Sequence, residues 1–258
     1  MKKRKSRIRM EKGVYLLPNL FTSGNLFCGF WSIIAVFQDQ YYYGAVAILL
    51  AAAFDLLDGK VARLAGATSK FGIQYDSLAD LVSFGVAPAV LAFSWALRPY
   101  GKFGWFAAFL FVACGALRLA RFNVMAASGD TKYFKGLPIP VAASTLALTI
   151  LLYLEWIETG LIKDVVILAM IYALAFLMVS SIRYSTFKEL DLARRQSFSR
   201  LTIIVLSLVV IIMKPVIVLS ALALFYVSSG PVGTLFAWNK KKAVKRLEPA
   251  PEVETRRD

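Results

Sequence analysis

Apolar stretches long enough to cross a lipid bilayer follow one another along most of this chain. A transmembrane helix needs about 20 predominantly apolar residues to span the hydrocarbon core. Read with that length, the sequence contains eight such runs, at 18–37, 42–63, 73–97, 103–122, 138–157, 162–182, 198–213 and 215–236. With 59% apolar and 18% charged residues, it is more hydrophobic than an average soluble domain. We therefore expect an all-α integral membrane protein with about eight transmembrane helices.

The positive charges fall almost entirely on one side of the predicted membrane. With eight spans, 26 of the 30 lysines and arginines lie in the two terminal segments and in alternate loops. Cytoplasmic loops carry such an excess of cations, so we expect both termini in the cytoplasm and the chain in the cytoplasmic (inner) membrane. One long last helix, kinked at Lys214-Pro215, is the alternative, but it would place the cations of the tail outside. Cations dispersed between apolar runs favour contact with anionic membrane lipids over binding to nucleic acid.

Composition divides the chain into four predicted segments. These are a basic amphipathic arm (1–14), six spans (15–182), a C-terminal helix pair (183–238) and a basic tail expected to be disordered (239–258). No small-residue cleavage site follows the arm, so the first helix is expected to be retained rather than removed as a signal peptide. The chain has no histidine and only two cysteines, which excludes catalysis by imidazole, zinc sites built on histidine and a disulfide scaffold.

Four aspartates occur where the second and third apolar runs meet a short loop. Asp55 and Asp58 are three residues apart and Asp76 and Asp80 are four apart, so each pair shares one face of its helix. The short loop brings the two helix ends together. Four converging carboxylates repel one another unless divalent ions or Arg63 lie between them or some are protonated. Oxygen ligands suit Mg²⁺ or Mn²⁺, and a pair of such ions would clamp phosphate oxygens.

Small and basic residues complete the pattern around the aspartates. Gly59 and Gly72 leave room for a ligand close to the backbone, and Arg63 can bind a diphosphate with two parallel hydrogen bonds. The whole pattern is Asp55-x2-Asp58-Gly59-x2-Ala62-Arg63-x8-Gly72-x3-Asp76-x3-Asp80. It resembles the signature of the CDP-alcohol phosphatidyltransferases, with every fixed position filled.

The resemblance implies a six-helix CDP-alcohol phosphotransferase core over 15–182, followed by a C-terminal helix pair. It also implies a homodimer and a CDP-linked lipid donor. Asp55, Asp58 and Asp76 would be metal ligands, and Asp80 would both contact metal and accept the proton of the acceptor alcohol. The CDP pocket would be lined by Gly59, Arg63 and Gly72, with Ser69 as a further phosphate contact. We also place Asn19, Thr22 and Asn25 near the nucleotide, although they could equally hydrogen-bond within the helix bundle.

Further segments resemble the members of this family that use L-serine as acceptor and CDP-diacylglycerol as donor. They are 17–22 with 25–29, 77–88, 117–123 and 134–140. Arg118 and Arg121 lie three residues apart and are predicted to bind the serine carboxylate, with Asn123 and Lys135 orienting it. The arginines alone do not select serine, because glycerol 3-phosphate or an inositol phosphate needs similar cations, and both arginines could instead extend to lipid headgroups.

The chemistry expected from these parts is direct displacement. No protein nucleophile with an activating base is visible, so we expect no covalent enzyme intermediate. A divalent-cation transporter is the alternative from another functional class, since its pathway also needs carboxylates within the membrane. Such carboxylates should approach the bilayer midplane, whereas these four are predicted to gather at one edge.

Overall fold

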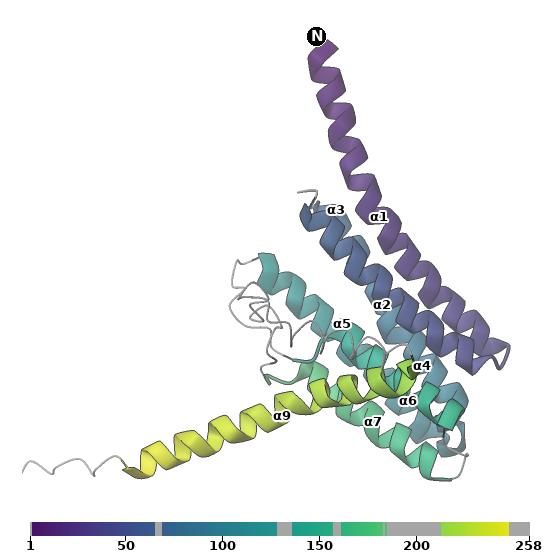
Figure 1. The fold of residues 1–258 in the computed structure, drawn as a ribbon, viewed down its shortest axis with the longest axis vertical. Helices are drawn as coiled ribbons and strands as arrows, with labels where there is room; N and C mark the ends of the chain where they lie inside the picture. The colour runs from purple at the N-terminus through teal and green to yellow at the C-terminus, as the bar shows by residue number, and fades with distance from the viewer. Residues whose placement is uncertain are drawn as a thin grey trace, which may run out of the picture.

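Every regular element in the described part of the chain is a helix (Figure 1). The computed structural model describes residues 2–64, 69–127, 136–156, 161–182, 184 and 213–247. The helices are α1 (Lys2–Phe37), α2 (Tyr41–Leu64), α3 (Lys70–Asp80), α4 (Ala87–Ala92), α5 (Lys102–Ala127), α6 (Ile139–Trp156), α7 (Leu161–Val179) and α9 (Pro215–Leu247), with the short turns η1 to η3 between α3 and α5.

Several of these helices have the length and apolar character of membrane spans. Five stretches qualify in the described residues: Leu17–Phe37, Lys70–Tyr100, Lys102–Met125, Ile139–Trp156 and Pro215–Thr234. The prediction of an all-α membrane protein is therefore confirmed. The expected seventh run, 198–213, lies outside the described residues except for Met213, so the total of eight spans stays a prediction.

The third span is one continuous helical segment with changes of pitch. After α3 come the π-helical turn η1 (Leu81–Val86), α4, a second π-helical turn η2 (Phe93–Leu97) and the 3-10 turn η3 (Arg98–Tyr100). A π-helical turn changes the direction in which the following side chains point, and such turns occur frequently at functional sites. The first one begins directly after Asp80.

The helices that carry the aspartates pack closely around α1. Helix α1 runs along α2 and also contacts α3 and η1, while α6 contacts α2 and α9. The contact with η1 depends on Gly29, where an added Cβ would lie 2.3 Å from Oγ of Ser83 and 2.6 Å from its Cα. Ser83 Oγ also donates a hydrogen bond of 2.9 Å to the carbonyl oxygen of Asn25. Small residues thus fix the position of α1 beside the start of η1.

Both ends of the described chain are more helical than the sequence predicted. Helix α1 runs from Lys2 into the first span without a break, so the basic arm continues the span as one helix. Helix α9 continues to Leu247, which corrects our expectation that the tail is disordered from residue 239. Residues 240–247 contain four lysines with Ala243, Arg246 and Leu247, all of which favour helix, and cations stabilise a helix C-terminus. Pro249 stands just beyond the end of the helix.

Candidate active site

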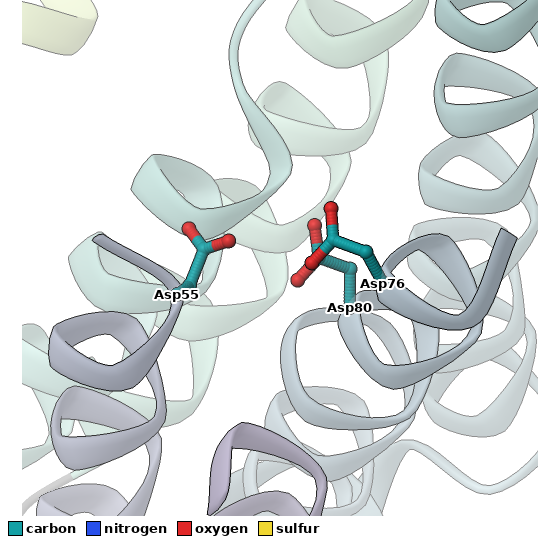
Figure 2. Close-up of side chains that lie close together, drawn as sticks. All are labelled: Asp55, Asp76 and Asp80. Atoms are coloured by element: carbon teal, nitrogen blue, oxygen red, sulfur yellow. The ribbon is translucent and has the colours of Figure 1, made fainter. Parts of the chain in front are cut away.

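Three of the four aspartates meet between α2 and α3. Carboxylate oxygens of Asp55, Asp76 and Asp80 lie within 4.8 Å of one another. Figure 2 shows Asp55 facing the other two across the gap between the helices. Asp80 is buried, and Asp55 and Asp76 are partly buried. Within the described residues, Oδ1 of Asp76 is buried without a hydrogen-bond partner. Clustered, partly desolvated carboxylates with an unsatisfied oxygen form a donor set that fits a hard divalent cation.

Asp58 is not part of this cluster and accepts a hydrogen bond from α1. Its side chain is buried, and Oδ2 accepts a hydrogen bond of 3.0 Å from Oγ1 of Thr22 on α1. Its charge is within electrostatic range of Asp76. The structure therefore brings three of the predicted ligands together and places the fourth at the edge of the same site, oriented by α1.

A second side chain of α1 contacts Asp80. Nδ2 of the fully buried Asn25 donates a hydrogen bond of 3.0 Å to Oδ1 of Asp80. The side-chain oxygen of Asn25, Oδ1, has no hydrogen-bond partner among the residues that the structure describes. The sequence predicted Asn25 as a nucleotide contact, whereas the structure places it against the carboxylate predicted to act as the base.

A cavity opens beside the carboxylates, between α1, α2 and the N-terminus of α3. Its lining residues are Pro18, Asn19, Thr22, Asp58, Gly59, Ala62, Ser69, Gly72, Ile73 and Asp76. The lining includes five predicted nucleotide contacts and two predicted metal ligands. Asn25 is absent from it, and the side chain of Arg63 lies outside the described part of the chain.

The N-terminus of α3 gives this cavity an anion-binding character. Ser69 is the N-cap residue, and its Oγ accepts a hydrogen bond of 2.9 Å from the backbone N–H of Gly72. Unpaired N–H groups and the helix dipole favour a negatively charged ligand at such a position. The cavity thus combines a helix N-terminus that favours phosphate binding with a neighbouring cluster of carboxylate oxygens that can bind a metal ion.

The residues predicted to bind the acceptor alcohol differ in their exposure and in their contacts. Arg118 of α5 is partly buried, lies within electrostatic range of Asp80 and Asp55, and has a buried Nε without a hydrogen-bond partner among the described residues. Arg121 is exposed, and Lys135 lies outside the described residues. Nδ2 of Asn123 donates a hydrogen bond of 2.9 Å to Oγ of Ser77, which ties α5 to α3 beside Asp76. Ser77 was missed by sequence reasoning, because nothing in its local pattern marks this contact.

A match to a known protein family accounts for this arrangement. The family model described as CDP-alcohol phosphatidyltransferase matches residues 15–182, which contain all four aspartates and the residues that line the cavity. The chain belongs to the CDP-alcohol phosphatidyltransferase family. Members of the family generally use divalent metal ions, and in this phosphatidyltransferase the cluster of Asp55, Asp76 and Asp80 offers ligands for one.

Three relatives with curated names show which members of the family this chain is similar to. A CDP-diacylglycerol–serine O-phosphatidyltransferase of Helicobacter pylori is 36% identical over 235 residues, which cover 89% of this chain and 98% of that protein. An archaetidylserine synthase of Methanothermobacter thermautotrophicus is 39% identical over 65% of this chain and 69% of its own length. The Bacillus subtilis CDP-diacylglycerol–serine O-phosphatidyltransferase is 34% identical over 67% of this phosphatidyltransferase and 92% of its own length.

Proposed function

We propose that this protein transfers a phosphatidyl group from CDP-diacylglycerol to the hydroxyl group of L-serine, which forms phosphatidylserine and releases CMP. The observation that carries the proposal is the cluster of Asp55, Asp76 and Asp80 beside an anion-binding cavity. The names of the three relatives support serine as the acceptor. Two of them name CDP-diacylglycerol and the third names an archaetidyl lipid, but all three name serine.

In this proposal Asp55, Asp58, Asp76 and Asp80 hold two Mg²⁺ or Mn²⁺ ions. The ions, when bound, would neutralise the diphosphate and the charge that develops on the oxygen of the departing CMP. Thr22 orients the Asp58 carboxylate through its hydrogen bond. Gly59, Gly72 and Ser69 line the space for the diphosphate, together with Asn19 and Thr22. Arg63 follows one turn after Gly59 on the same helix and is proposed to bind the diphosphate.

Asp80 is proposed as the general base. A hydroxyl is a poor nucleophile near neutral pH, so a carboxylate within reach must take its proton. The serine oxygen then bonds to the phosphorus of the phosphatidyl group, while the bond from that phosphorus to the bridging oxygen breaks and CMP leaves. The hydrogen bond from Asn25 holds the Asp80 carboxylate in place during this step.

Arg118 is proposed to bind the carboxylate of serine. Its buried Nε–H has no hydrogen-bond partner in the described part of the chain, so a substrate carboxylate would satisfy a donor that is otherwise costly to bury. Asn123, fixed to Ser77, stands on the same helix and is proposed to help orient the amino acid. Arg121 and Lys135 are also proposed to contact serine. Arg121 is exposed, and Lys135 lies outside the described residues.

The membrane location, the orientation and the oligomeric state of the enzyme are part of the proposal. We propose a homodimer in the cytoplasmic membrane, with both termini and the active site on the cytoplasmic side, as the distribution of lysine and arginine predicts. The catalytic core is proposed to be 15–182, the range of the family match. The basic arm and the C-terminal helices then lie outside the core.

A panel of acceptors tests this proposal. Purified protein receives CDP-diacylglycerol, Mg²⁺ or Mn²⁺ and one alcohol at a time, and CMP release and lipid product are followed. We expect serine to give phosphatidylserine, and chelation of the metal to stop CMP release. Turnover with glycerol 3-phosphate or an inositol phosphate but not with serine would contradict the acceptor. Ion flux into vesicles without CMP release would contradict enzymatic function altogether.

A further inference from the structure

A serine of α3 connects this helix to α5 beside the carboxylate cluster. Ser77 directly follows Asp76, and its Oγ accepts a hydrogen bond of 2.9 Å from Nδ2 of Asn123 on α5. Helix α5 also contacts η1, the turn that continues α3. The carboxylate of Asp76 is a member of the cluster with Asp55 and Asp80. The hydrogen bond therefore holds a polar side chain of α5 next to the turn of α3 that carries a proposed metal ligand.

The hydroxyl group of Ser77 acts as an acceptor toward Asn123. A serine hydroxyl has one proton to donate, and its oxygen can also accept. Oγ of Ser77 donates this proton to the carbonyl oxygen of Ile73, one turn earlier in α3, over 3.0 Å. The side of the oxygen that faces Asn123 thus carries a lone pair. It requires the NH₂ group of the amide on that side, because two acceptor oxygens cannot hydrogen-bond to each other.

This chain of hydrogen bonds fixes the orientation of the Asn123 amide. With Nδ2 turned toward Ser77, the carbonyl oxygen Oδ1 points away from that hydroxyl group. Turning the amide over would place its oxygen against the Ser77 oxygen and would lose the hydrogen bond. Asn123 is partly buried, so its amide is shielded from bulk water without being enclosed. An oxygen with a fixed direction in such a place is suited to accept a hydrogen bond from a substrate.

We propose that Ser77 is a positioning residue for the acceptor: it holds the Asn123 amide so that Oδ1 receives the ammonium group of the amino acid. The inference rests on the proposed function and deepens it, because it assigns one group of serine to Asn123. An ammonium group can only donate hydrogen bonds, so its partner must be an acceptor. In serine this group is on the carbon next to the one that bears the reacting hydroxyl. The residue that binds it must therefore lie close to the carboxylate cluster, and the contact at Ser77 meets this requirement.

Replacing Ser77 removes the orienting hydroxyl group and leaves Asn123 in place. We expect Ser77→Ala to raise the KM for serine about five- to tenfold, with kcat and the KM for CDP-diacylglycerol unchanged. Ser77→Thr keeps a hydroxyl group and should restore most of the affinity. Ser228→Ala on α9 is the matched control, because Ser228 also donates to a carbonyl oxygen one turn earlier, that of Leu224. Its KM for serine should equal the wild-type value, and thermal unfolding in detergent checks that all variants are folded.

A serine analogue without the amino group separates recognition of the ammonium from a general loss of acceptor binding. The analogue is 3-hydroxypropanoate, measured as an inhibitor that competes with serine. We expect the wild-type enzyme to bind it more weakly than serine, and Ser77→Ala to change its inhibition constant by less than about twofold, because Oδ1 of Asn123 has no ammonium to bind. An inhibition constant that rises as much as the KM for serine would overturn the proposed role of Ser77.

The Asn123→Ala background shows whether Ser77 acts through the amide. If it does, Ser77→Ala should add nothing to the KM for serine of Asn123→Ala. Additive effects, or a higher half-saturating Mg²⁺ concentration in Ser77→Ala, would show that the hydroxyl group supports α3 and Asp76 instead, and would contradict the inference. These outcomes leave the proposed function intact. Absence of a lipid product from serine in the wild-type enzyme would contradict the proposed function itself.

Discussion

At the scale of single residues, the site is a set of carboxylates whose surroundings differ. Asp80 is buried and accepts a hydrogen bond from Asn25, and Asp58 accepts one from Thr22. One oxygen of Asp76 has no hydrogen-bond partner in the part of the chain that is described. The sequence predicted the aspartates, because four acids at helical spacing in apolar surroundings are rare without a function. It could not assign Asn25 to Asp80, because that contact joins residues 55 positions apart and depends on how α1 packs.

Asp80→Asn tests the proposed base. The substitution keeps the size of the side chain and removes its ability to take a proton, so kcat should fall by roughly 10²–10⁴-fold. Binding of CDP-diacylglycerol, measured by equilibrium titration, should stay within a few fold, because the cavity residues are unchanged. Retention of full turnover in Asp80→Asn would show that the proton goes elsewhere.

Thr22→Val tests the support of the metal site from α1. The variant keeps the shape of the side chain but loses the hydrogen bond to Asp58. We expect the half-saturating Mg²⁺ concentration for CMP release to rise about tenfold, as is typical when a partner of a metal ligand is removed. Ser23→Ala is the matched control, because Ser23 is adjacent but hydrogen-bonds to Asn19 and Tyr75. Equal metal dependence in the two variants would contradict the role given to Thr22.

At the scale of elements, close helix contacts place the carboxylates. Helix α1 lies against η1 at Gly29, and η1 begins at the residue after Asp80. The sequence predicted the spans by their apolar length, but the π-helical turns have no comparable signal because they depend on packing. The C-terminal end of α9 was underestimated, because the high charge of the tail indicated disorder, while Lys, Arg and Ala are also good helix formers.

Gly29→Ala tests the contact between α1 and η1. The added methyl group would meet the backbone of Ser83, so the helices must separate, at a cost of about 1–3 kcal/mol in the free energy of unfolding. Turnover should fall as well, since Asn25 and Asp80 move apart. Gly233→Ala on α9 is the control, because its Cβ would have no neighbour within 4 Å. Comparable thermal unfolding of both variants in detergent would contradict a tight contact at Gly29.

At the scale of the whole molecule, the chain has a membrane-embedded core, and α9 lies outside the range 15–182 that the family model matches. Composition alone indicated the membrane, and one motif indicated the family, because both are local properties of the sequence. The packing of α9 on α6 could not be predicted, since its hydrogen bond from Ser220 to Leu148 joins residues 72 positions apart. In this account the core supplies the chemistry, and α9 packs against the core on α6.

The most direct test of the central claim is an anomalous-scattering map of the protein crystallised with Mn²⁺ and CDP-diacylglycerol. The account predicts manganese peaks about 2.0–2.5 Å from carboxylate oxygens of Asp55, Asp76 and Asp80, beside the diphosphate. Manganese bound away from these residues, or a diphosphate outside the cavity at Ser69 and Gly72, would contradict it.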